Sequence, residues 1–151
     1  MTEFAPLNPD YENVVRESFA KQGIMNHIRA EMGNLRPGYC EIKLPYSDDV
    51  SQQHGFFHGG VVGTIADSAA GYAAFSLMAQ GDGILTVEYK LNLMAPADGE
   101  WMVARGEVVR PGRSLTIGKA EVSVLKGEEE TPCALMQTTL MRIVGRADVS
   151  G

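Results

Sequence analysis

The sequence has little of the chemistry that several protein classes require. It contains only two cysteines and three histidines. Cys40 and Cys133 lie in apolar, alternating stretches, and neither has a second Cys or His at metal-ligand spacing. We therefore expect two buried free thiols and no metal site. The glycines do not follow the spacing of a phosphate loop or a dinucleotide fingerprint, so no nucleotide cofactor is expected.

Positive charge is also scarce. Thirteen Lys and Arg stand against nineteen Asp and Glu, which gives a formal net charge of -6. Such a surface repels nucleic acid and anionic membranes, so we expect binding to neither. No apolar run reaches membrane-spanning length, and the first ten residues lack the basic and apolar regions of a secretory signal. We therefore expect a cytoplasmic protein.

The chain of 151 residues is long enough to bury a core and suits a single domain over residues 1–151. Residues 1–10 and 146–151 are expected to be loose termini. Apolar spacing favours a short helix over residues 11–22, ended by Gly23. Two strands around an LRPG turn are expected within residues 28–46, followed by a polar loop.

Residues 59–80 carry almost no charge and read as one long, buried helix. After it, alternating patterns predict four strands, at residues 84–94, 101–109, 115–125 and 133–144. The short loops between them suggest an antiparallel meander, with KGEEETP as an exposed loop. Only the long helix is apolar enough to cover such a sheet. We therefore predict an α+β hot-dog fold, in which an antiparallel sheet wraps around one central helix.

Asp67 lies in the middle of this apolar helix. A carboxylate in apolar surroundings must be paired, hydrated or protonated, so its placement costs stability. The residues three and four positions away are small: Gly63, Thr64, Ala70 and Gly71. They leave space that a substrate could occupy. The alternative is that Asp67 only hydrogen-bonds nearby backbone.

His58-Gly59-Gly60 precedes the helix. The first N–H groups of a helix have no partner within it and lie at the positive end of the helix dipole. Such donors can hold the oxyanion of a thioester under attack, and glycine lets a ligand approach closely. The alternative is that the glycines only shape a turn. Gly59 and Asp67 are eight residues, or roughly 12 Å, apart on one helix. One chain cannot supply both groups to one carbonyl, so an enzyme of this kind must be at least a two-fold dimer.

The segment QQHGFFHGGVVGTIADSAAGYAA (Gln52 to Ala74) closely resembles the signature of hot-dog acyl-CoA thioesterases. The similarity is to the phenylacetate-degradation (PaaI-like) branch, which has an Asn or Gln, a His-Gly-Gly six residues later, and an Asp or Glu eight residues after the first glycine. It continues through residues 86–97 and 112–122.

The resemblance implies hydrolysis of an acyl-CoA to the free acid and CoA, with CoA as part of the substrate and no cofactor. Asp67 would be the general base or the nucleophile, and the Gly59 N–H of the partner subunit would polarise the carbonyl. Gln52 would position the water or the carbonyl, and Thr86 would hold the attacking water. The resemblance also implies a homodimer or a homotetramer made of two dimers.

Several further residues are candidates for substrate binding. His58 is either a helix cap or a site residue, and Gly60 adjoins the expected oxyanion donor. Gln53 and His54 are rivals of Gln52, because loop register is not fixed by sequence. Arg110 and Arg113, with Lys119, form a cationic cluster that could meet CoA phosphates, or an ordinary solvated turn. The candidate lining of an apolar acyl pocket is Phe56, Phe57, Tyr72 and Phe75.

Two other functions fit the same fold. One is a non-catalytic acyl-CoA-binding or sensing module, for which a buried acid has no evident use. The other is a hot-dog dehydratase, which needs a His paired with an acid in one pocket, whereas the central helix offers only His58. The sequence predicts neither the acyl group nor the pathway.

Overall fold

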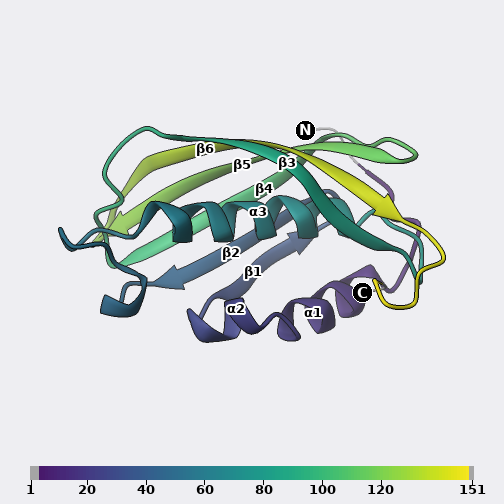
Figure 1. The fold of residues 1–151 in the computed structure, drawn as a ribbon, viewed down its shortest axis with the longest axis horizontal. Coiled ribbons are helices and arrows are strands. Elements are labelled where there is room, and N and C mark those ends of the chain that lie inside the picture. The colour runs from purple at the N-terminus through teal and green to yellow at the C-terminus, as the bar shows by residue number, and fades with distance from the viewer. Residues whose placement is uncertain (1–3, 150–151) are drawn as a thin grey trace.

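The computed structural model describes residues 4–149 (Figure 1). Its helices are α1 (Tyr11–Ala20), α2 (Gly23–His27) and α3 (Gly59–Phe75), with a 3-10 helix at Asp48–Val50. Its strands are β1 (Glu31–Arg36), β2 (Tyr39–Pro45), β3 (Gly83–Leu93), β4 (Trp101–Arg110), β5 (Leu115–Lys126) and β6 (Glu129–Ile143). The expected helix, hairpin, long helix and four strands are all present. The expectation of loose termini falls partly on residues outside this description.

The six strands form one antiparallel sheet in the order β1-β2-β4-β5-β6-β3. The expected meander is therefore wrong at one connection, because β3 pairs with β6 and not with β4. Reaching β4 from β3 means crossing three strand spacings, about 14 Å. The seven residues 94–100 can extend over roughly 23 Å, which is enough to make that crossing.

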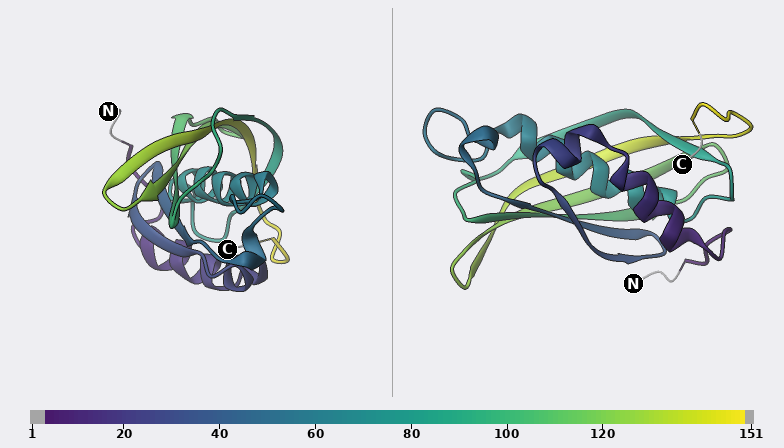
Figure 2. Two further views of the ribbon diagram at one scale, coloured as in Figure 1. Left: turned by 90° about the vertical axis from the view of Figure 1, so that its left-hand side faces the viewer. Right: turned by 90° about the horizontal axis from the view of Figure 1, so that it is seen from below.

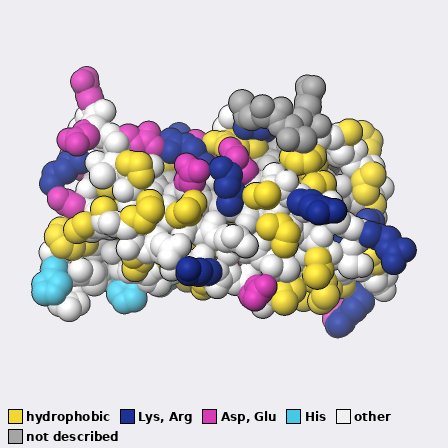
Figure 3. All heavy atoms as spheres, turned by 90° about the horizontal axis from the view of Figure 1, so that it is seen from above, with side chains coloured by type: hydrophobic (Ala, Val, Ile, Leu, Met, Phe, Trp, Pro, Cys, Tyr) yellow, Lys and Arg dark blue, Asp and Glu magenta, His cyan; other side chains and the backbone are white. Residues whose placement is uncertain are grey.

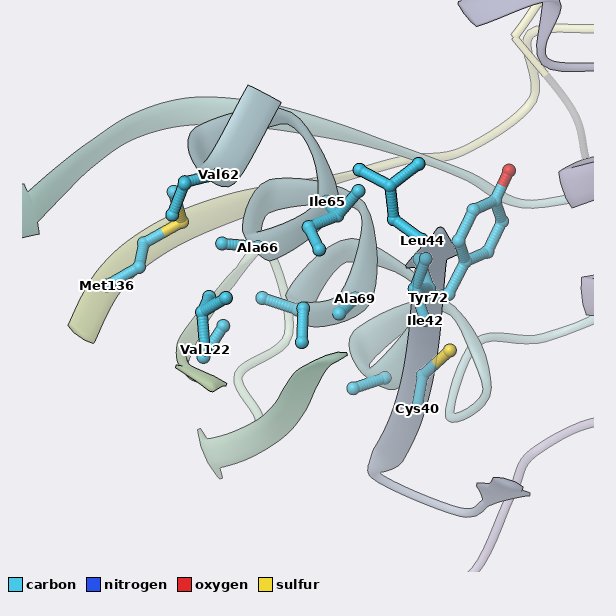
Figure 4. Packing of buried hydrophobic residues seen from close by; sticks show 14 of the residues in the cluster. Cys40, Ile42, Leu44, Val62, Ile65, Ala66, Ala69, Tyr72, Val122 and Met136 are labelled. Atoms are coloured by element: carbon cyan, nitrogen blue, oxygen red, sulfur yellow. The ribbon is translucent and has the colours of Figure 1, made fainter. Parts of the chain in front are cut away.

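The sheet curls around α3, as the view along that helix in Figure 2 shows. The short helices α1 and α2 lie on the outer surface, where α1 contacts β1. The apolar face of α3 packs on β2, β5 and β6 (Figure 4). Gly106 of β4 permits the closest approach, since a Cβ there would lie 2.2 Å from the Ala69 backbone. The hot-dog arrangement predicted from the sequence is thus the one observed.

Three expected boundaries were wrong. Helix α3 ends at Phe75 and not at residue 80, because the buried Ser76 hydroxyl donates to the Ala73 carbonyl and accepts the Gly38 N–H. Gly23 begins a second short helix, α2, where only a helix end was expected. Strand β6 starts at Glu129, because Gly127 (φ +59°) closes a tight hairpin turn in the KGEEETP segment.

The edge strand β3 is unusually exposed. It pairs with β6 on one side and has no strand partner on the other among residues 4–149. Leu85, Val87, Tyr89 and Leu93 are each about half exposed. Figure 3 shows hydrophobic side chains scattered between charged ones on the face over β3, β5 and β6. A long apolar edge is a template for pairing with another chain, so this edge marks a candidate subunit interface.

Both cysteines are buried and free, as expected. Burial raises the pKa of Cys40 to about 12 and that of Cys133 to about 11, so neither thiol is activated at neutral pH. None of the described helices has the length and apolar character needed to cross a membrane.

Candidate active site

Asp67 lies two turns into α3, on the side of the helix that faces β3. Its Oδ1 accepts a hydrogen bond from the Thr86 hydroxyl of β3 at 2.8 Å. The carboxylate is partly buried, whereas its helical neighbours Ala66 and Ala69 are fully buried in the core. The structure therefore brings together Asp67 and Thr86 of the same chain, and the expected role of Thr86, holding the attacking water, stays a prediction.

Burial raises the pKa of Asp67, because removing a carboxylate from water disfavours its charged form. The hydrogen bond from Thr86 acts in the opposite direction and lowers that pKa, since it stabilises the charged form. Desolvation is the larger of the two effects. A carboxylate with a raised pKa is a stronger base than an exposed one, which suits removal of a proton from water.

A cavity of about 230 Å³ opens beside Asp67, and we call it the Asp67 cavity. Gly71 leaves space in its wall, because a Cβ there would meet no atom within 4 Å. Tyr72, Phe75 and Ile84 supply aromatic and aliphatic surface. The carboxylate thus has room beside it for a substrate group of mixed polar and apolar character.

A β-bulge in β3 aims Thr86 at the helix. Thr86 pairs with Leu140 and Glu88 pairs with Thr139, so Val87 is an extra residue on the β3 side. Before the bulge, the even-numbered Thr86 faces α3. After it, the residues that face α3 are odd-numbered: Tyr89, Leu91 and Leu93. Without the extra residue one of these sets would face away from the helix.

At the start of α3, the His58 side chain caps the helix. Its Nδ1 accepts the Gly60 N–H at 2.9 Å, and its backbone oxygen accepts the Val61 N–H at 2.9 Å. His58 is therefore engaged in helix capping, one of the two roles open from the sequence. The Gly59 N–H donates to no acceptor among residues 4–149, so that donor remains available at the positive end of the helix.

A second cavity, of about 180 Å³, lies at this end of the helix, and we call it the Gly59 cavity. Gln52 and Phe57 line it together with Gly59, and the Gln52 Oε1 accepts the His54 N–H. Gln53 is exposed and does not line the cavity. The loop register therefore favours Gln52 over Gln53 and His54 as a neighbour of the Gly59 N–H.

The predicted aromatic lining is divided between the two cavities. Phe56 and Phe57 line the Gly59 cavity, whereas Tyr72 and Phe75 line the Asp67 cavity. No residue lines both. Within one chain, the base and the oxyanion donor are thus in separate places, as the spacing along the helix required.

Of the three cationic residues expected to meet CoA phosphates, only one forms ion pairs within the described part of the chain. Lys119 forms ion pairs with Glu107 and Glu121, both at 3.2–3.3 Å. Arg110 and Arg113 are exposed and form no ion pair with any residue of the range 4–149. Neither arginine lines the Asp67 or the Gly59 cavity, so their contact with CoA stays a prediction.

Several residues of the Asp67 cavity were not foreseen, among them Ser18 of α1, Gln22 just before α2, and Val149 near the C-terminus. They come from segments far apart in the sequence, and nothing in their local patterns marks them. Among residues 4–149, no group of three or more His, Cys, Asp or Glu side chains is placed to hold a metal ion.

Comparison with known proteins finds a match to the thioesterase superfamily over residues 54–131. A candidate esterase of Saccharolobus solfataricus is 30% identical over 103 residues, 68% of each chain. The crystal structure of a thioesterase family protein from Silicibacter pomeroyi superposes with a TM-score of 0.88 at 47% identity, covering 89% of this chain and 99% of that one. A 1,4-dihydroxy-2-naphthoyl-CoA hydrolase of Listeria monocytogenes is 23% identical, over 67% of this chain and 82% of the relative.

Proposed function

The chain belongs to the thioesterase superfamily, and on that premise we propose that it hydrolyses an acyl-CoA thioester to the free acid and CoA. The observation that carries the proposal is Asp67, a partly buried carboxylate held by Thr86 at the side of a cavity. A binding module gains nothing from a group whose burial costs stability. CoA as the thiol component is supported by the CoA hydrolase among the relatives, and by the sequence signature.

In the simplest mechanism Asp67 is a general base. Its carboxylate removes a proton from water as the water oxygen bonds to the thioester carbon, and the carbonyl oxygen takes the negative charge. Collapse of this tetrahedral intermediate breaks the carbon–sulfur bond, and the proton on Asp67 passes to the CoA sulfur. Alternatively the Asp67 carboxylate attacks the carbonyl carbon itself, and the carbon–sulfur bond breaks to expel CoA as its thiolate. Water then hydrolyses the mixed anhydride, which restores the Asp67 carboxylate, releases the free acid and supplies the proton that the thiolate takes up.

The oxyanion in either route needs a donor, and the backbone N–H at the start of α3 does not line the Asp67 cavity of the same chain. The Gly59 N–H of a second subunit would supply it, and Gln52 of that subunit would help to position the carbonyl or the water. Two copies joined by antiparallel pairing of their β3 edges would place their α3 helices side by side in opposite directions. The middle of the Gly59–Asp67 segment is Gly63, which faces Leu91 and the Tyr89 hydroxyl of β3. The two-fold axis would pass near these residues.

The test is release of free CoA from a panel of acyl-CoAs by the wild type, Asp67→Ala and Asp67→Asn. Loss of the base should lower kcat by about a hundredfold or more. Asp49→Asn, at an exposed acid of the 3-10 helix, is the matched control and should keep wild-type turnover. Equal turnover by the wild type and both Asp67 variants would refute the assignment.

A further inference from the structure

The segment after β6 folds back onto the molecule. Figure 1 shows it turning from the end of β6 towards α1. Within it, the Arg146 side chain pairs with the Asp148 carboxylate, and the Val149 N–H donates to the Arg146 carbonyl at 3.0 Å. These local bonds give the segment a defined turn, which presents the half-buried Val149 to the body of the protein.

The turn rests on Gly83, the first residue of β3. A Cβ on Gly83 would lie 1.7 Å from the Val149 carbonyl oxygen, far inside contact distance. Only glycine at this position therefore allows the backbone of Val149 to lie where it does. Gly83 has no positive φ, so close approach is what requires the glycine.

Val149 occupies the end of the Asp67 cavity that is distant from the carboxylate. Along α3, Phe75 is eight residues beyond Asp67, roughly 12 Å. Along β3, Gly83 is three residues before Thr86, about 10 Å. Both Phe75 and Gly83 line the cavity together with Val149, so the cavity runs from the acid to this residue.

We propose that Val149 forms the end wall of the acyl subsite and limits the length of the acyl group that the enzyme accepts. The inference rests on the proposed function, in which the thioester carbonyl lies at Asp67. An unbranched acyl chain leading away from that carbonyl would follow the wall made by Phe75 and Ile84 and would stop at Val149. The substrates would be short- to medium-chain acyl-CoAs, with longer chains excluded by contact with Val149.

The experiment compares kcat/KM over a series of straight-chain acyl-CoAs from acetyl to lauroyl. Val149→Ala opens the end wall, and Gly83→Ala displaces the same segment without changing a side chain beside Asp67. Both variants should raise the ratio of long-chain to short-chain kcat/KM by about tenfold or more. One additional methylene group accommodated in an apolar pocket changes kcat/KM by roughly that factor. Val149→Trp should shift the preference towards shorter chains.

Gly23→Ala is the control, since a Cβ there would meet no atom within 4 Å, and its profile should match the wild type. Length profiles of Val149→Ala and Val149→Trp that both follow the wild type would overturn the proposal, whatever Gly83→Ala does.

A second readout separates this proposal from the proposed function. Calorimetric binding of the same acyl-CoAs is measured in the Asp67→Asn background, with and without Val149→Ala. If affinity falls beyond a certain acyl length, and Val149→Ala extends that length, the end wall is supported even if the wild type releases no CoA. Affinities that do not change with acyl length, or a limit that Val149→Ala leaves unchanged, would contradict the end wall even if hydrolysis is confirmed.

Discussion

The Asp67 cavity and the Gly59 cavity lie on the same helix and differ in what they offer. The first has a carboxylate whose pKa is raised by burial and a hydroxyl that holds it. The second has a free backbone N–H at the positive end of the helix and the amide of Gln52. The first offers a base for water and the second a backbone donor for an oxyanion, and no residue lines both cavities.

Under the proposed function, this difference gives a use to each of the costly or unusual features that lie at two separate points of one helix. A buried acid and a glycine-rich helix start are each of limited use alone. They become complementary when a second helix runs antiparallel to the first. The exposed apolar edge of β3, which follows the same side of α3, is the surface that such an arrangement would cover.

The largest expected effect comes from removing the Gly59 N–H. Gly59 is the first residue of α3, where proline is well tolerated, and His58 has the extended backbone (φ -66°, ψ 137°) that precedes proline. Gly59→Pro should lower kcat by about a hundredfold, the usual cost of one lost oxyanion donor.

Gly59→Ala is the matched control, because it adds a Cβ and keeps the N–H. That Cβ would lie 3.0 Å from a Leu93 methyl group, a flexible side-chain end that can move. Its kcat should therefore stay within a few-fold of the wild type. Similar losses in both variants would show that bulk, and not the donor, matters at this position.

A smaller effect is expected from Thr86→Val in the other cavity. The Thr86 hydrogen bond lowers the pKa of Asp67, so its loss should raise that pKa further. Because the base acts as the carboxylate, activity rises as pH increases through this pKa, and the acidic limb of the kcat/KM profile should move to higher pH. At a pH on the acidic limb of the wild-type profile, the kcat/KM of Thr86→Val should be about tenfold lower than that of the wild type. Thr86→Ser should restore the profile, and an unshifted limb in Thr86→Val would contradict this role.

The smallest effect concerns stability. Since the folded protein raises the pKa of Asp67, this carboxyl favours folding below its unfolded pKa of about 4 and loses that contribution as pH rises through the folded value. Asp67→Asn removes the buried charge and should raise Tm at neutral pH by roughly 2 °C, a small shift because the group is partly solvated. The gain should shrink as pH falls towards 4, roughly the unfolded pKa. Thermal unfolding that shows a lower Tm for Asp67→Asn at neutral pH would count against a desolvated carboxylate.

Much of the fold could be predicted, because it depends on local periodicity. The apolar segment after His58 identified the central helix, and the alternating segments identified the sheet around it. The place of β3 could not be predicted, since the residues after Leu93 can reach either an adjacent or a distant strand. The end of α3 also depended on a tertiary contact, the bond between Ser76 and Gly38.

Some residues of the candidate site could likewise be predicted from the sequence, and others could not. Asp67 and Gly59 are visible in the sequence because a lone acid and a glycine pair stand out in an apolar helix. The resemblance to hot-dog thioesterases added Gln52 and Thr86. The bulge at Val87 that aims Thr86, and the wall residue Val149, depend on pairing and packing between distant segments, for which the sequence has no local signal.

Subunit complementation tests most directly whether each active site is shared between two subunits. Differently tagged Asp67→Asn and Gly59→Pro chains are co-expressed, and the mixed dimer is purified and assayed for release of CoA. If the sites are shared, one site of the mixed dimer has both an intact Asp67 and an intact Gly59. Turnover should then recover to roughly half that of the wild-type dimer. A mixed dimer no more active than its two parents would contradict the shared site.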